Sequence, residues 1–100
     1  MTQPVRLQLS RRKGFDLQKA SRAINALPAT KVTRPGPWGN PFRIGIEAQT
    51  AADAVAMFRR DFRKLFARHS LKPLRGKNLA CWCGADDPCH ADVLLIFANR

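Results

Sequence analysis

The side chains best suited to chemistry lie in one short stretch of the chain. All three cysteines and one of the two histidines fall within ten positions, as Cys81, Cys83, Cys89 and His90. A thiolate is both a nucleophile and a metal ligand, and an imidazole serves as an acid, a base or a ligand. Thiol catalysis and metal binding are therefore the two chemistries open to this stretch.

Thiol catalysis would centre on Cys89. Asp87 followed by Pro88 predicts the start of a helix, with Asp87 as its N-cap. The next two residues, Cys89 and His90, then fall in the first turn, where the free N–H groups also suit a phosphate or oxyanion. We expect the helix dipole and His90 to lower the pKa of the Cys89 thiol. His90 would then be a general acid or base, and Asp92 would orient a polar group.

Metal binding would use three sulfurs and one nitrogen, a set that zinc accepts. The candidate ligands are Cys81, Cys83, Cys89 and His90. Their spacing lacks the usual gap of two to four residues between paired ligands, and adjacent Cys89 and His90 rarely reach one tetrahedral ion together. Three ligands and a water would make an open site instead. A third alternative is that Cys81 and Cys83 are small core residues with no chemical role.

A loop rich in proline and glycine, residues 34–42, is the second candidate for ligand binding. Its prolines make it stiff, and Trp38 offers an aromatic face for stacking a base. Asn40 would supply an amide edge, while Arg34 and Arg43 would contact phosphate. The alternative is structural, with Trp38 covering the end of the sheet and Asn40 forming a turn.

Alternating strands and helices are expected to position these residues. Hydrophobic patterning predicts strands at residues 5–9, 30–33 and 78–83. It predicts one helix at residues 16–27, a second that begins at a capping box at 50–53, and a final helix that includes the apolar run 93–98. The predicted fold is a small single α/β domain over residues 1–100, with a mostly parallel three- or four-stranded sheet flanked by helices. The carboxyl ends of parallel strands share one edge, where ligands bind. The 34–42 loop and the cysteine loop should therefore form one crevice.

The helix after the capping box combines an apolar stripe with a basic outer face. The stripe, which we expect to pack in the core, comprises Ala54, Val55, Phe58, Phe62, Leu65, Phe66 and His69. Away from it lie the candidate nucleic-acid contacts Arg59, Arg60, Arg63, Lys64 and Arg68. With 18 Lys and Arg against 7 Asp and Glu, the formal net charge is +11. Such an excess favours a polyanionic partner, nucleic acid or nucleotide.

Composition also bears on compartment and assembly. No apolar run approaches the roughly 20 residues of a membrane span, and the N-terminus lacks the pattern of a secretory signal, so we expect no membrane association and a reducing cytoplasm. An odd number of cysteines then favours thiols or metal ligands over disulfides. The final helix is apolar nearly all round, as expected if it packs on the sheet or on a second subunit. The second alternative predicts a homodimer through this helix.

Two sequence blocks point to a family. Residues 38–42 read WGNPF, and residues 74–83 read LRGKNLACWC, followed by CHADVLL at 89–95. These blocks resemble the small bacterial and phage family catalogued as domain of unknown function 4326, and the likeness spans nearly the whole chain. The resemblance implies a compact domain and no known activity.

These patterns together predict a nucleotide- or nucleic-acid-binding protein whose site is the rim formed by the Trp38–Phe42 loop and the Cys81–His90 loop. A thiol-dependent enzyme is one form of that prediction. The alternative is a non-enzymatic basic module that binds nucleic acid and whose cysteines are structural or hold zinc. No other cofactor is implied.

Overall fold

The computed structural model describes residues 3–34, 36–67, 70–84 and 86–100. Its elements in chain order are β1 (Arg6–Gln8), α1 (Leu17–Asn25), β2 (Ala29–Lys31), α2 (Ala51–Arg60), α3 (Phe62–Leu65), a short 3-10 helix η1 (Lys72–Leu74), β3 (Asn78–Cys81) and α4 (His90–Ala98). The predicted α/β class is confirmed. No helix within the described ranges is long and apolar enough to cross a membrane.

The sheet has three strands, all parallel, in the order β1-β3-β2. Leu7 of β1 pairs with Ala80 of β3, and Thr30 of β2 pairs with Leu79. The four residues of β3 are all buried, as expected for the central strand of a sheet that is covered on both faces. Because the strands are parallel, the segments that follow β2 and β3 leave the sheet at the same edge.

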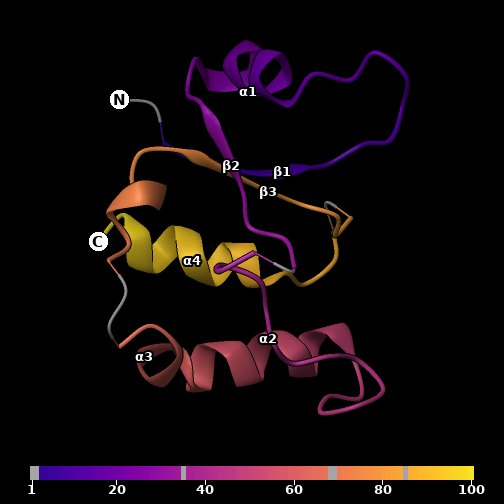
Figure 1. The fold of residues 1–100 in the computed structure, drawn as a ribbon, viewed down its shortest axis with the longest axis vertical. Coiled ribbons are helices and arrows are strands. Elements are labelled where there is room, and N and C mark those ends of the chain that lie inside the picture. The colour runs from indigo at the N-terminus through magenta and orange to yellow at the C-terminus, as the bar shows by residue number, and fades with distance from the viewer. Residues whose placement is uncertain (1–2, 35, 68–69, 85) are drawn as a thin grey trace.

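Helices lie in layers on either side of the sheet (Figure 1). Helix α1 covers one face, α4 covers the other, and α2 and α3 lie on the far side of α4. Helix α4 is thus enclosed by the sheet and by α2, which explains why it is apolar nearly all round. The sequence left open whether a second subunit covers this helix. In the structure, α2 of the same chain covers the side of α4 that faces away from the sheet. Ile96, 46% exposed, is the large apolar side chain of α4 that stays open to solvent.

The predicted helix starts at Asp16 and Thr50 are confirmed. The Asp16 carboxylate accepts a hydrogen bond from the backbone N–H of Lys19, and Thr50 Oγ1 accepts one from Asp53, both at 3.1 Å. The helical spacing of Leu17, Ala20, Ile24 and Leu27 predicts an apolar stripe along α1, but this prediction is wrong at Ile24, which is 59% exposed. Ser21 is the buried residue of α1, and its hydroxyl donates to the carbonyl of Leu27.

The long basic helix is divided in two. Helix α2 ends at Arg60 and α3 begins at Phe62, because Asp61 between them leaves the helical backbone region with φ −97° and ψ 11°. The apolar stripe survives the break, since Phe58 and Phe62 are both buried in the main core. The predicted positions Arg68 and His69 lie outside the described residues.

Candidate ligand-binding site at the carboxyl edge of the sheet

The start of α4 differs from the predicted start by two residues. Helix α4 begins at His90 with Cys89 as its N-cap, so Asp87 is not the cap and Pro88 is not the first helical residue. The backbone N–H of Asp87 instead donates to the carbonyl of Gly84 and closes a turn in the loop. A Cβ atom at Gly84 would lie 2.8 Å from the Asp87 carboxylate, so a larger residue there would make the Asp87 side chain shift. The shift places the Cys89 side chain at the N-terminal end of α4.

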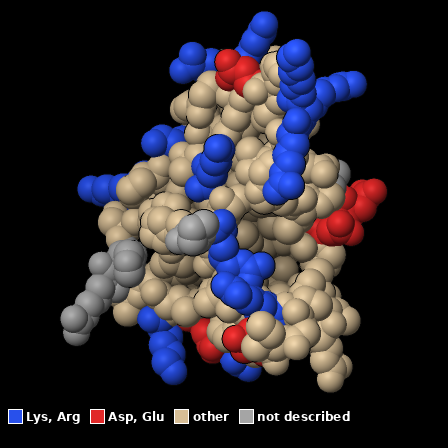
Figure 2. Space-filling model, turned by 45° about the vertical axis from the view of Figure 1, so that its right-hand side comes forward, with Lys and Arg blue, Asp and Glu red and all other residues tan. Residues whose placement is uncertain are grey.

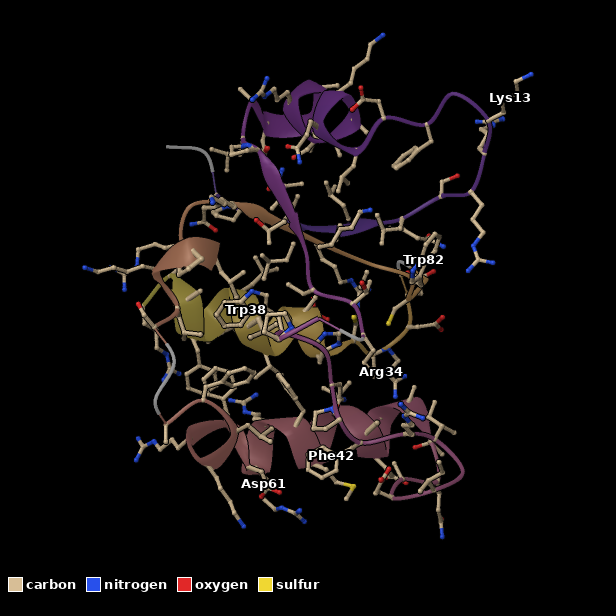
Figure 3. All side chains as sticks on the ribbon, viewed as in Figure 1. Lys13, Arg34, Trp38, Phe42, Asp61 and Trp82 are labelled. Atoms are coloured by element: carbon tan, nitrogen blue, oxygen red, sulfur yellow. The ribbon has the colours of Figure 1, made fainter. Side chains whose placement is uncertain are left out.

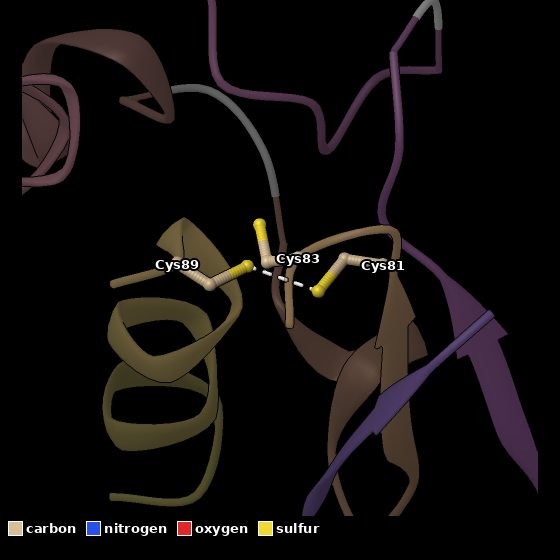
Figure 4. Close-up of side chains that lie close together, drawn as sticks. All are labelled: Cys81, Cys83 and Cys89. Carbon is tan, nitrogen blue, oxygen red and sulfur yellow. Dashed lines mark hydrogen bonds between the residues drawn. The ribbon is translucent and has the colours of Figure 1, made fainter. Parts of the chain in front are cut away.

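Three cysteines converge at this edge, and we call Cys81, Cys83 and Cys89 the cysteine cluster (Figure 4). Cys81 ends β3, Cys83 lies two residues further on, and Cys89 caps α4. The three Sγ atoms all lie within 4.8 Å of one another, and those of Cys81 and Cys89 are 3.0 Å apart. Cys81 and Cys89 are buried, whereas Cys83 is partly exposed. The cluster therefore joins the central strand to the first turn of α4.

His90 is held by the neighbouring strand segment. Its Nε2 lies 2.7 Å from the carbonyl oxygen of Val32, just beyond β2. A carbonyl only accepts, so Nε2 carries the proton in this bond, and Nδ1 of the neutral ring is an acceptor. Nδ1 lies 3.8 Å from the Sγ of Cys89, and the ring packs edge-on against Phe58. His90 is thus fixed in orientation beside the cluster.

The thiol pKa values differ from the sequence expectation. The pKa of Cys89 is raised to about 11 by its hydrogen bond with Cys81 and by burial, although His90 acts in the opposite direction. The pKa of Cys81 is lowered because the Cys89 thiol donates to it. Burial is the main cause that raises the pKa of Cys83 to about 11. The expectation that the helix dipole and His90 lower the pKa of the Cys89 thiol is therefore wrong, because the hydrogen bond with Cys81 and burial outweigh the effect of His90.

Arg6 of β1 holds the loop that carries the cluster. Its guanidinium donates to the carbonyls of Gly84 and Asp87 at 3.1 and 2.9 Å. The same group bonds the carboxylate of Asp92 at 3.2 Å, so Asp92 positions Arg6 and not a reacting group. In the sequence, Arg6 is one of four basic residues near the start of the chain, with Arg11, Arg12 and Lys13, and was not a candidate site residue. Its place in the site follows from the parallel pairing of β1 with β3, which no local pattern encodes.

A cavity of about 280 Å³ opens beside the cluster, where the two loops were expected to meet. Its lining includes all three cysteines and His90 on one side, and Arg34, Asn40 and Phe42 on the other. Figure 3 shows Arg34 between Trp82 and Phe42 on the same side of the molecule. The cavity thus brings a cation and apolar side chains to the cysteine cluster.

Two predicted ligand contacts of the 34–42 loop serve the fold instead. The ring of Trp38 stacks on Phe66 at 5.8 Å and is not part of the cavity lining. Asn40 is buried, donates from Nδ2 to the carbonyl of Ala54, and accepts from the N–H of Phe42. Both ends of its amide therefore bond within the protein, although the residue also lines the cavity. These contacts give Asn40 the turn-forming role that the structural alternative predicted, and they pack Trp38 on Phe66.

The two predicted arginines of that loop occupy different places. Arg34 lines the cavity, while Arg43 is outside the lining and its backbone N–H bonds the Glu47 carboxylate at 2.7 Å. Trp82, which the sequence did not single out for binding, is 48% exposed and has the guanidinium of Arg11 4.9 Å above its ring. A sequence feature that could have indicated Trp82 is its position between Cys81 and Cys83, in the segment predicted to reach the rim.

On the face that Figure 2 displays, the described basic residues do not form one continuous surface. Figure 3 places Lys13 and Asp61 at opposite ends of the molecule, so the group at residues 11–13 is remote from the basic helix. Figure 2 shows Lys and Arg side chains separated by uncharged surface on the face that it displays. Arg60 forms two hydrogen bonds with Asp61, which lower the pKa of that carboxyl. The exposed cations left on α2 and α3 are Arg59, Arg63 and Lys64.

Comparison with known proteins identifies a family and no activity. The sequence profile of the family described as "Domain of unknown function (DUF4326)" matches residues 15–100. That range includes the cavity lining and the cysteine cluster, but not β1 with Arg6. No curated protein and no solved structure matches the chain.

Proposed function

The chain belongs to the family of domain of unknown function 4326, and from the site geometry we propose that it binds a nucleotide in the cavity and acts on it through the cysteine cluster. The observation that carries the proposal is the cavity itself, which joins Arg34 to the cluster and to the N-terminal end of α4. Ligands of parallel α/β sheets bind at this edge. A volume of about 280 Å³ suits one nucleotide better than a longer strand.

The phosphate of the nucleotide would lie between Arg34 and the first turn of α4. A helix N-terminus offers unpaired N–H groups and a partial positive charge to an anion, and a guanidinium can bond two phosphate oxygens at once. Phe42 and Trp82 line the same cavity and supply apolar surface for the base. Trp38 has no part in this arrangement because its ring stacks on Phe66.

The cysteine cluster would be the reactive end of the site, which makes the protein a thiol-dependent enzyme. Cys81 and Cys89 are close enough to share a proton, and the Nδ1 of His90 faces Cys89 as an acceptor. Asp92 contributes indirectly by holding Arg6. The proposal takes the protein to work in a reducing cytoplasm, which keeps the three thiols from oxidising.

Calorimetric titration of the full chain with nucleoside monophosphates, and with the matching nucleosides, tests the proposal. The monophosphate should bind with one-to-one stoichiometry, and Arg34→Gln should weaken it by about tenfold or more, the usual effect of losing a charged hydrogen bond. Arg43→Gln is the matched control, because Arg43 lies on the same loop outside the cavity, and it should bind normally. Equal losses in the two variants, or no saturable binding of any nucleotide, would refute the proposal.

The second candidate function is a non-enzymatic module that binds nucleic acid through α2 and α3, with zinc held by the cysteine cluster and His90 as a structural group. The observation that favours it is the exposure of Arg59, Arg63 and Lys64. None of these three forms a salt bridge with a carboxylate among the described residues. Affinity for a single-stranded oligonucleotide should then fall steeply with salt, and each charge removed should flatten the log–log slope by about one unit. Loss of affinity in Arg34→Gln but not in Arg59→Gln would instead favour the cavity.

Self-association stays a prediction. Ile96 is the exposed large apolar residue of α4, so a homodimer through this helix would bury it. Sedimentation of Ile96→Glu beside the unchanged protein decides this point, since only a dimer through α4 would dissociate.

A further inference from the structure

The cysteine cluster has the composition of a metal site. Three Sγ atoms from β3, the following loop and the α4 cap lie within 4.8 Å of one another (Figure 4). We infer that Cys81, Cys83 and Cys89 bind one zinc-type divalent ion and leave its fourth coordination position open to the cavity, where the bound ligand completes it. The identity of that ligand as a nucleotide rests on the proposed function; the metal site and its open position do not. With the ion bound, the three thiolates act as its ligands, and the open position of the ion replaces a free thiol as the reactive group.

The geometry is close to what the ion needs. Zinc–sulfur bonds of about 2.3 Å in a tetrahedron separate the sulfurs by about 3.8 Å. The 3.0 Å between Cys81 and Cys89 must therefore widen by less than about 1 Å, and the other pairs already lie within 4.8 Å. We expect side-chain rotation to achieve this without moving the strand or the helix. Binding ionises the thiols and releases their protons to solvent.

Arg6 prepares the site for the ion. Its hydrogen bonds to the Gly84 and Asp87 carbonyls fix the loop between the second and third ligands. Three thiolates and one divalent ion carry a net charge of −1, and the Arg6 guanidinium interacts electrostatically with Cys81 and Cys89 as well as with Asp92. A loop held in this way loses little conformational freedom when the metal binds.

The fourth ligand is not His90. Its Nε2 is bonded to the Val32 carbonyl at 2.7 Å, and its ring is packed against Phe58. Only Nδ1 remains, and it is 3.8 Å from the Cys89 sulfur without belonging to the group of mutually close ligand atoms. All three cysteines line the cavity, so the open position faces the ligand. A site with three protein ligands and one exchangeable position is the arrangement of catalytic zinc.

The ion would act on an anionic oxygen donor, such as the phosphate of a nucleotide or a water molecule that it ionises. A metal at this place offers an open Lewis-acid position at the same end of the cavity as Arg34 and the α4 N-terminus. The three groups together favour a ligand that carries a phosphate over one that carries only a base.

Cobalt(II) substitution of the reduced full-length protein tests the inference, because its visible spectrum reports coordination directly. We expect one equivalent of Co²⁺, intense tetrahedral d–d bands and a sulfur-to-cobalt charge-transfer band. Inorganic phosphate or a nucleoside monophosphate should shift the d–d bands. Cys83→Ser should weaken Co²⁺ binding by more than the roughly 10- to 100-fold typical of losing an outer-shell partner.

His90→Gln is the matched variant, because its amide can still donate to the Val32 carbonyl. It should keep the cobalt spectrum and the response to phosphate. Absence of stoichiometric Co²⁺ in the unchanged protein, loss of the tetrahedral bands in His90→Gln with the fold retained, or bands that no phosphate compound shifts would each overturn the inference. X-ray absorption of the zinc-loaded protein gives the sulfur count without any variant, and a count other than three also overturns it.

The inference and the proposed function fail separately. Cobalt bands that inorganic phosphate shifts, in a protein that binds no nucleotide, would support the open metal site and refute the nucleotide. Nucleotide binding by a protein that takes up no metal would support the nucleotide and refute the metal site.

Discussion

The Nε2 of His90 donates a hydrogen bond to the carbonyl of Val32 over 2.7 Å, and this bond ties the first turn of α4 to the end of β2. Both residues are buried. His90→Phe keeps a ring against Phe58 but leaves the Val32 carbonyl without its donor. We expect the free energy of unfolding to fall by about 1–3 kcal/mol, the cost of a buried unpaired acceptor.

Urea denaturation measures this loss for His90→Phe beside His90→Gln, which retains a donor and should lose less. Ile96→Ala is the surface control on the same helix and should change stability by about 0.5 kcal/mol at most. Equal stability of the Phe and Gln variants would show that the hydrogen bond contributes nothing.

Arg6→Met removes the three hydrogen bonds that hold the Gly84–Asp92 segment. Because these bonds are partly exposed, water can replace them, and we expect a loss of only about 1 kcal/mol in stability. The larger effect should be on the loop, so Cys83 should react several-fold faster with iodoacetamide in reduced, chelator-treated protein. Arg12→Met, on an exposed side chain in the loop after β1, should react like the unchanged protein. No acceleration in Arg6→Met would mean that the loop keeps its shape without Arg6.

Asn40→Asp should destabilise the protein even though the two side chains have nearly the same shape. The carboxylate can still accept from the N–H of Phe42, but it faces the carbonyl of Ala54 where the amide donated at 3.0 Å. Two acceptors then meet in a buried place, and we expect a loss of about 1–3 kcal/mol. Thermal denaturation checks this, with Gln49→Ala as the exposed control. If Asn40→Asp instead left the stability unchanged and weakened ligand binding, the role of Asn40 would be ligand recognition.

Stability of the reduced, metal-free protein should fall above about pH 9. Thiols of the unfolded chain ionise near pH 8.5, whereas the pKa values of Cys83 and Cys89 are raised to about 11 in the fold. The unfolded state therefore loses these protons first, and the free energy of unfolding declines between about pH 8.5 and 11. The lowered pKa of Cys81 acts the other way, but its stabilising effect has reached its limit by that pH.

Urea denaturation in steps from pH 8 to 10.5 measures the slope, and Cys83→Ala is the matched variant. With one raised thiol removed, its stability should decline less steeply, while the lysines titrate alike in both proteins. Identical slopes would show that burial does not raise the pKa of Cys83.

Much of the fold was predictable from local sequence. The helix starts at Asp16 and Thr50 depend on a side-chain oxygen that bonds an N–H three residues later, and the parallel sheet follows from strands that alternate with helices. The break at Asp61 was missed because the apolar stripe continues across it. The start of α4 was missed because Asp87, a good cap by residue type, bonds back to Gly84 instead. In both cases contacts within the fold outweighed a local preference.

The residue pattern placed three cysteines and a loop with Arg34 at one edge of the predicted sheet. Their roles depend on packing between distant segments, which stacks Trp38 on Phe66, bonds the amide of Asn40 to Ala54, and brings Arg6 from β1 to the cysteine loop. This packing also gives Cys81 the more acidic thiol, because the 3.0 Å approach of Cys89 lets that thiol donate to it. Residue types set what each group can do, but hydrogen bonding and burial depend on distances between segments far apart in the chain, and those exist only once the chain has folded.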